Sequence, residues 1–147
     1  MAAEYSVRTV RGSDAAAIAR LCGQLGYPCV DEAIAGRLER FSSDPNACAF
    51  VADRGGDILG LVTVHLRYTL NHDAPIAQLS MLVVDESARR TGAGKRLVAA
   101  VEAWARDHGA KRVVVNTALH RAEAHQFYES LAFAHTGRRY MKDLPAI

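Results

Sequence analysis

The sequence predicts an α/β protein in which a mixed β-sheet carries helices on both faces. Three observations support this class. Strand-like apolar runs alternate with stretches of helical periodicity along the chain. Two of these runs, 58–66 and 76–84, are apolar on both faces and therefore indicate buried strands. Half of the 147 residues are apolar, which is enough to form a full core.

The first half of the chain is expected to form a strand, two helices and a hairpin. Residues 5–10 alternate between polar and apolar side chains, as a half-buried strand does. Ser13 is suited to cap the first helix and Asp31 the second, and apolar residues recur at helical spacing in both. Two adjacent glycines separate strands 47–52 and 58–66, and they tolerate the positive φ that a tight hairpin turn requires.

The second half is expected to add three strands and two helices. Residues 76–84 form a strongly apolar strand. The helix that follows has apolar residues every three to four positions until Gly109 stops it. The chain then continues with a short buried strand at 113–115, a helix over 122–130 and a final strand over 133–140.

Composition excludes several classes of protein. The formal net charge of +2 is too small to attract nucleic acid or a membrane surface. The N-terminus has no basic segment followed by an apolar one, and no run approaches the ~18 apolar residues of a membrane helix. Three widely spaced cysteines indicate neither a disulfide framework nor a zinc site. We therefore expect one cytoplasmic domain over 1–147, with reduced thiols and no catalytic metal.

The turn between strand 76–84 and the next helix carries the most informative residues. The first turn of a helix has free N–H groups and a partial positive charge. The glycines of this turn allow a ligand to approach the backbone, and its basic side chains add positive charge. The pattern predicts a phosphate or pyrophosphate site, which we call the cradle. The cradle consists of Arg89, Arg90, Thr91, Gly92, Ala93, Gly94 and Lys95.

Two familiar phosphate motifs do not fit the cradle. Leu97 stands where the dinucleotide fingerprint needs its third glycine. Arg89 replaces the first glycine of the nucleoside-triphosphate loop, and Arg96 stands where that loop needs serine or threonine. For this stretch taken alone, a basic loop without a ligand is the alternative.

The stretch R-x-x-G-x-G after an apolar strand resembles the acetyl-CoA motif of the GNAT family of N-acetyltransferases. The segment 121–133, RAEAHQFYESLAF, is similar to that family's A-x-x-F-Y-x-x-x-G-F segment. The order of elements also agrees over nearly the whole chain. The resemblance implies a single-domain GNAT-like fold with a splayed, mostly antiparallel sheet. It also implies an enzyme that transfers acetyl from acetyl-CoA to a primary amine.

The resemblance assigns roles to residues of this chain. Leu82, Val83 and Val84 would lie beside pantetheine, and the sheet would part after Val84 to admit the cofactor. The cradle would bind the pyrophosphate. Phe127 would contact the cofactor, and Tyr128 would lie near the thioester sulfur as the acid that protonates the leaving thiolate. Nothing in the sequence indicates a covalent intermediate, so direct attack in a ternary complex is expected.

The chain departs from the family pattern at two places. Ala132 replaces a usual glycine. Many relatives carry a glutamate in strand 76–84 that helps to deprotonate the amine, whereas the candidate positions here are Gln78, Ser80 and Met81, none of which is a general base. The remaining candidate proton acceptors are His72, Asp73 and His65, with a water relay as the alternative.

The sequence leaves three hypotheses about the substrate class. Segment 121–128 looks most like that of small-molecule acetyltransferases, such as those that act on aminoalkylphosphonates and aminoglycosides, so a small-molecule amine is expected. A protein lysine or N-terminal acetyltransferase is an alternative, and so is a non-catalytic acyl-CoA sensor. A homodimer is common among such folds.

Overall fold

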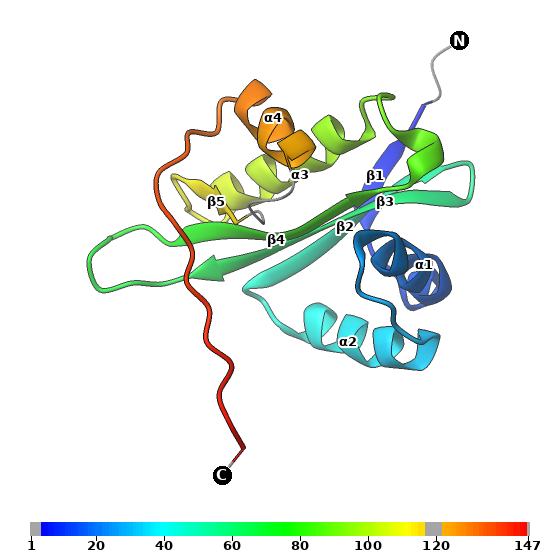
Figure 1. Cartoon of the computed structure of the whole chain (residues 1–147), viewed down its shortest axis with the longest axis horizontal. Coiled ribbons are helices and arrows are strands. Elements are labelled where there is room, and N and C mark those ends of the chain that lie inside the picture. Colours follow the sequence, from blue (N-terminus) through cyan, green and yellow to red (C-terminus); the bar gives the residue numbers. More distant parts are fainter. Residues whose placement is uncertain (1–3, 117–121, 147) are drawn as a thin grey trace. The chain divides into compact units, whose positions relative to one another are not determined.

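The computed structural model describes residues 4–116 and 122–146. The chain divides into two compact units, the first ending at Val115 and the second beginning at Asn116. The first unit contains a five-stranded sheet with helices on both faces (Figure 1). In the second unit, the described residues form one helix, α4, Ala122–Ser130.

The sheet is mixed and mostly antiparallel, as the sequence predicts. Its strands lie in chain order, and all neighbours are antiparallel except the last pair, which is parallel. Gly55 and Gly56 have φ values of 59° and 100°, which confirms the expected hairpin turn. The strands are β1 Ser6–Thr9, β2 Ala47–Arg54, β3 Asp57–Arg67, β4 Ile76–Val84 and β5 Val113–Val115.

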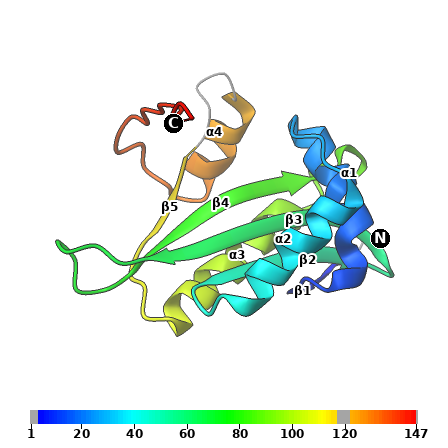
Figure 2. The same cartoon turned by 90° about the horizontal axis from the view of Figure 1, so that it is seen from below.

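Three helices cover the two faces of this sheet. Helices α1, Ala15–Leu25, and α2, Asp31–Ser43, pack on one face, and α3, Ala93–Asp107, packs on the other (Figures 1 and 2). The apolar residues of α1 and α2 form one core with alternate residues of the central strands. Members of this core include Ile18, Leu21, Ile34, Leu38, Val51, Leu61 and Val83.

The two expected helix caps differ in the structure. Ser13 lies inside a short 3-10 helix, Gly12–Asp14, and Asp14 rather than Ser13 accepts the N–H of Arg11 at 2.8 Å. Asp31 is the first helical residue of α2, and Val30 occupies the cap position. A carboxylate in the first turn still stabilises the helix, because it faces the positive end of the helix dipole.

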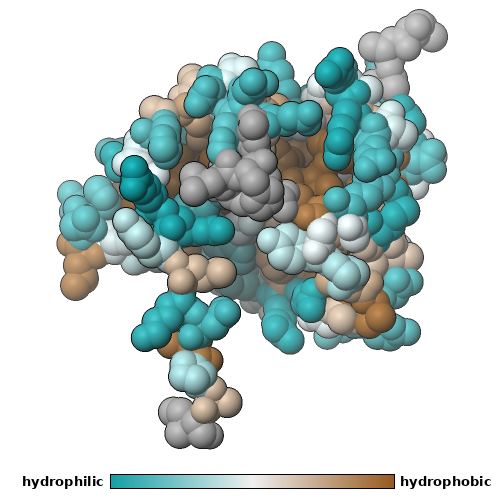
Figure 3. Space-filling model, viewed as in Figure 1, coloured by the Kyte–Doolittle hydropathy of each residue, from teal (hydrophilic) through white to brown (hydrophobic). Residues whose placement is uncertain are grey.

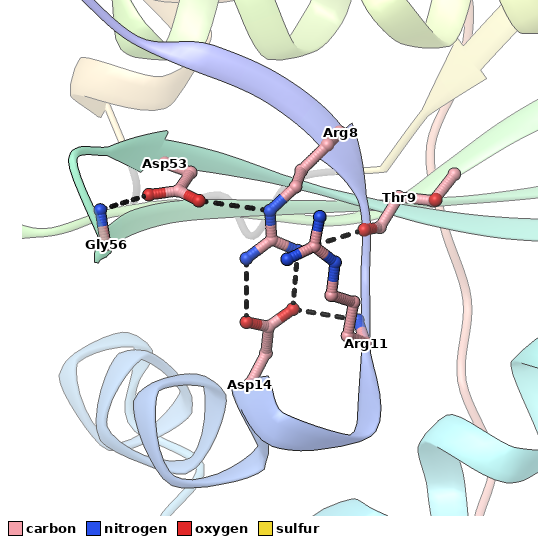
Figure 4. Close-up of polar contacts among 6 residues, drawn as sticks. All are labelled: Arg8, Thr9, Arg11, Asp14, Asp53 and Gly56. Carbon is pink, nitrogen blue, oxygen red and sulfur yellow. Dashed lines mark hydrogen bonds and ion pairs between the residues drawn. The ribbon is translucent and has the colours of Figure 1, made fainter.

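An ion-pair network fixes the start of α1 against the sheet (Figure 4). Arg8 on β1 donates two hydrogen bonds of 2.9 Å to the buried Asp14 and one of 3.1 Å to Asp53. Asp53 also accepts the N–H of Gly56 in the hairpin turn. The bidentate Arg8 guanidinium lowers the pKa of Asp14, and Asp14 in turn raises the pKa of Arg8.

The final strand expected over 133–140 is not formed. No strand includes these residues, and every described residue from 134 to 146 is exposed. The segment has no alternating apolar face to bury, because its centre reads His-Thr-Gly-Arg-Arg. Strand-like residues at its two ends, Phe133 and Tyr140, led to the wrong prediction.

Candidate active site

The cradle follows β4 directly and ends in the first turn of α3. A 3-10 turn, Glu86–Ala88, leads into Arg90 and Gly92, whose φ values of 64° and 89° are both left-handed. Gly92 occupies the cap position of α3, and no side chain caps the helix there. The first-turn N–H groups of α3 therefore remain available to an anion.

The positive charges of the cradle are also available. Arg89, Arg90 and Lys95 are exposed, and none of them forms an ion pair with any residue in the described part of the chain. Ala93 is buried, so its side chain does not reach a ligand. The cradle thus combines first-turn backbone donors with three exposed cations, which suits a pyrophosphate.

A buried carboxylate holds the beginning of the cradle in place. Asp85 is 7% exposed and accepts hydrogen bonds from the N–H and hydroxyl of Ser87, from Gln24 at 2.8 Å and from the Arg20 guanidinium. Gln24 also accepts the N–H of Glu86 at 3.2 Å. Donors from Ser87, Gln24 and Arg20 hold the pKa of Asp85 well below its usual range. Helix α1 is thereby joined to the loop that follows β4.

The side chain of Thr91 serves the loop itself. Its hydroxyl lies 3.0 Å from the Tyr5 hydroxyl and donates to the carbonyl of Ala88. The Arg96 guanidinium donates to the carbonyl of Tyr5, so the residue before β1 also contacts the first turn of α3. Thr91 therefore offers a ligand its backbone N–H, while its hydroxyl helps to fix the left-handed turn.

The sheet opens along β4, next to the cradle. Strand β5 pairs only with Ala77–Leu79, in the register Ala77 with Val113 to Leu79 with Val115. On that side, residues 80–84 of β4 have no strand partner among the residues that the structure describes. The separation follows Leu79, so the expected parting after Val84 is wrong by five residues. β5 is too short to follow β4 farther.

Backbone alternation decides which residues of β4 face the opening. Asp85 donates its N–H to Leu59 of β3, and in an antiparallel pair every second residue faces the same neighbour. Val83 therefore directs its N–H and C=O toward β3, and its side chain lies in the core. Leu82 and Val84 direct their backbone groups toward the opening. Of the three expected pantetheine contacts, the structure brings these two to the open edge.

Helix α3 lies close to this end of the sheet. Gly60, which is paired with Val84, has no side chain, and a Cβ added there would lie 2.9 Å from Cδ1 of Leu97. Leu97 lies one turn into α3 and is fully buried. The absence of a side chain at Gly60 lets the first turns of α3 approach the sheet beside Val84.

The three candidate proton acceptors lie elsewhere in the first unit. His65 on β3 is half-buried, with its ring 5.1 Å from that of Phe41 on α2. His72 and Asp73 are exposed in the loop before β4 and line a hollow of about 230 Å³ with Lys111 and Arg112. The nine residues of β4 span about 26 Å. The structure therefore places His72 and Asp73 at the opposite end of β4 from the cradle.

In the second unit, Tyr128 and Phe127 lie near the end of α4. Tyr128 is 9% exposed, and its ring lies 5.3 Å from that of Phe127 and 5.5 Å from that of Phe133. The N–H groups of Phe133 and Ala132 donate to the carbonyls of Tyr128 and Glu129, which is a Schellman ending. Ala132 has a left-handed φ of 68°, which explains why a glycine is usual at this position. Arg121 lies outside the described residues.

Sequence reasoning missed the residues that hold the cradle. The D-x-S pattern from Asp85 to Ser87 is a recognisable turn signal. Arg20 and Gln24 are four positions apart on α1 and therefore share a face, but no sequence signal connects them to a residue more than sixty positions later. Tyr5 directly precedes β1, and no sequence signal indicates that its hydroxyl contacts Thr91.

Within the part of the chain that the structure describes, no group of three or more His, Cys, Asp or Glu side chains is arranged to hold a metal ion. None of the helices in residues 4–116 and 122–146 combines the length and the apolar character that a membrane crossing requires.

Comparisons with known proteins agree on one family. The profile of the acetyltransferase (GNAT) family matches residues 17–133. The aminoalkylphosphonate N-acetyltransferase of Salmonella typhimurium is 30% identical, over 84% of this chain and 78% of that protein. A type 1 aminoglycoside N(6')-acetyltransferase of Stenotrophomonas maltophilia is 26% identical, over 94% and 92%. The structure of aminoglycoside N-acetyltransferase AAC(6')-Iy in complex with CoA has the same fold, with a TM-score of 0.86 and 22% identity, over 97% of this chain and 96% of that one.

Proposed function

Because the chain belongs to the GNAT family of acetyltransferases, which use acetyl-CoA, we propose that it acetylates the primary amine of a small molecule by direct attack in a ternary complex. The observation that carries this proposal is the start of α3, which has no side-chain cap and three exposed cations. It lies beside residues 80–84 of β4, which lack a second strand neighbour among residues 4–116 and 122–146. A pyrophosphate on the cradle would leave the pantetheine arm free to run along that edge.

The pantetheine arm finds suitable partners on β4. It contains two amide groups. Leu82 and Val84 direct backbone donors and acceptors into the opening, where no strand in the described part of the chain pairs with them. Hydrogen bonds to these groups extend the arm along the strand as an additional strand would. A backbone N–H near the thioester would also stabilise the negative charge that develops on the carbonyl oxygen during attack.

The chemistry requires movement of two protons. A lysine-like amine has a pKa of about 10.4, so it must lose one proton before its lone pair can attack the thioester. The nitrogen–carbon bond forms, the carbon–sulfur bond breaks, and the nitrogen loses a second proton. We assign Tyr128 as the acid that protonates the leaving thiolate, and the second amine proton replaces the proton that Tyr128 has given. The first proton passes to solvent, directly or through His65, His72 or Asp73.

A small-molecule acceptor is favoured over a protein. The relatives from Salmonella typhimurium and Stenotrophomonas maltophilia are named for aminoalkylphosphonates and aminoglycosides, and this chain covers most of the length of both. Both kinds of compound carry primary amines. A protein substrate would instead require an extended peptide groove, so a panel of peptides beside small amines distinguishes the two classes.

Calorimetric titration with acetyl-CoA tests the cradle. We expect Arg89→Ala/Arg90→Ala to weaken binding by about 100-fold, because two charge-assisted contacts to the pyrophosphate are lost. Arg37→Ala/Arg40→Ala is the matched control, since it removes the same charge from exposed positions on α2, across the sheet from α3. Equal affinity of wild type and the cradle variant would contradict the assignment.

Steady-state kinetics of Tyr128→Phe test the acid. The ring contacts with Phe127 and Phe133 are kept, so only the hydroxyl is lost. We expect kcat to fall by about 100-fold with little change in the KM for acetyl-CoA. An unchanged kcat would remove Tyr128 from the mechanism.

A further inference from the structure

Strand β4 contains a β-bulge at Ser80. In its ladder with β3, Thr63 is opposite Met81 and Val64 is opposite Leu79, so Ser80 has no partner residue. A bulge of this kind redirects a side chain and is frequent beside active sites. Ser80 is also the first residue of β4 beyond the pairing with β5. The bulge and the opening of the sheet therefore coincide at one residue.

The Ser80 side chain is held by a second hydroxyl. Its Oγ lies 2.7 Å from Oγ1 of Thr63, which is 8% exposed, whereas Ser80 itself is exposed. If Ser80 donates its proton to Thr63, both lone pairs of its oxygen remain free to accept hydrogen bonds. The buried partner fixes the direction of the exposed hydroxyl.

This hydroxyl pair faces the helices α1 and α2. Leu61, Thr63 and His65 are alternate residues of β3 and therefore share a face. Leu61 belongs to the core formed with α1 and α2, and His65 contacts Phe41 of α2. The pair therefore lies on the opposite face of the sheet from α3, whose first turn forms the cradle. A cofactor from the α3 side and an acceptor from the other side would meet at the opening.

The length of the pantetheine arm would bring the thioester close to Ser80. The arm has about twelve bonds between the pyrophosphate oxygen and the sulfur, as many as about four peptide residues, and spans ~13 Å when extended. Ser80 lies four residues before Val84, the end of β4 beside the cradle. An arm that runs along the open edge from the cradle therefore ends near Ser80.

We propose that Ser80 contacts the acceptor amine and orients it, and that Thr63 is the positioning residue that holds Ser80. Oγ of Ser80 accepts an N–H of the neutral amine and directs the nitrogen lone pair toward the thioester carbonyl. The hydroxyl gains and loses no proton overall, because the protons of the amine go to solvent and to the CoA sulfur. The inference rests on the proposed acetyltransferase function.

The test measures thiol release from acetyl-CoA with 2-aminoethylphosphonate, kanamycin and spermidine, together with acetyl-CoA binding by calorimetry. For the best amine, we expect Ser80→Ala to lower kcat/KM by about tenfold, while acetyl-CoA affinity stays within about twofold. Ser6→Ala, another exposed serine on a strand of the same sheet, is the matched control. Thr63→Val should reproduce part of the loss, and Thr63→Ser should restore the activity because it keeps the hydroxyl.

The outcomes separate the inference from the proposed function. A wild type that binds acetyl-CoA but acetylates no amine refutes the proposed function and the inference with it. An active wild type with an equally active Ser80→Ala variant overturns the inference alone. A Ser80→Ala variant that loses acetyl-CoA binding in proportion to activity also overturns it, because the residue would then support the fold or the cofactor rather than the amine.

Discussion

The two ends of β4 are built very differently. At the C-terminal end, Asp85 is buried and satisfied by donors from three other residues, and Thr91 contacts Tyr5. At the N-terminal end, the loop before Ile76 is largely exposed, including the large side chains Tyr68 and Leu70. Figure 3 shows hydrophobic surface at the left edge, where Figure 1 draws the loop between β3 and β4. The comparison teaches that an anion bound by backbone groups needs a fixed main chain, whereas no such constraint acts on the hairpin loop.

The strongest test of this comparison is Asp85→Asn. The amide keeps the shape but loses the charge that Arg20 and the donors of Ser87 and Gln24 stabilise. We expect acetyl-CoA affinity to fall by about tenfold and the free energy of unfolding by about 1–3 kcal/mol. Asp57→Asn, at the exposed first residue of β3, is the control for loss of charge. Wild-type affinity in the Asp85 variant would show that the loop needs no fixed carboxylate.

Removal of one donor should have a smaller effect. Gln24→Leu deletes the contact with Asp85 and the acceptor for the N–H of Glu86, but it leaves Ser87 and Arg20 on the carboxylate. We expect a three- to fivefold rise in the KM for acetyl-CoA, equivalent to about 1 kcal/mol, with kcat nearly unchanged. A lower kcat at constant KM would instead connect α1 with the acceptor side of the site.

Low pH should lower the free energy of unfolding of the first unit, because carboxylates that accept several hydrogen bonds become protonated. The pKa values of Asp14 and Asp85 are lowered below the ordinary 3.8 by their partners, so the folded protein binds fewer protons than the unfolded chain. This stabilisation is complete above that ordinary value and is lost as the pH falls through the lowered folded-state pKa values. The urea concentration at the unfolding midpoint, measured between pH 7 and pH 2, should decrease once the pH is below about 4. In Asp14→Asn, the decrease of the midpoint at low pH should be smaller than in wild type. A wild-type midpoint that stays unchanged down to pH 3 would contradict the predicted pH dependence.

The smallest effect on cofactor binding is expected at the other end of β4. His72→Ala and Asp73→Ala change exposed side chains about 26 Å along the strand from the cradle. Acetyl-CoA affinity should stay within about twofold. The pH dependence of kcat/KM in these variants checks their candidate role in proton acceptance, because a variant that keeps the same dependence excludes its residue.

The sheet and the cradle could be predicted from the sequence because local patterns encode them, whereas the contacts that hold the cradle could not. Strands β3 and β4 are recognisable because burial on both faces forces continuous apolar runs. The cradle is recognisable because Gly92 and its basic neighbours are selected by local backbone geometry and charge. The contacts of Asp85 with Arg20 and Gln24 join residues more than sixty positions apart, and nothing local encodes such a pairing.

The bulge at Ser80 shows a second limit of sequence reading. A single polar residue within an apolar strand is compatible with either face, and only the register with β3 shows that it is an extra residue. The segment 133–140 shows the reverse error. Aromatic residues at its ends have high strand propensity, but strand formation depends on burial against a partner, which its polar centre does not favour.

Residues 80–84 of β4 have a strand neighbour on only one side among the described residues, and this affects which substitutions the protein can accept there. In the proposed complex, the ligand completes the sheet as a missing strand would, through the main chain of Leu82 and Val84. Every amino acid except proline supplies the same N–H, so natural variation among apolar residues at these two positions leaves the ligand's hydrogen bonds intact. Proline at either position would remove one of them while leaving the ladder with β3 untouched, since these residues do not donate to β3.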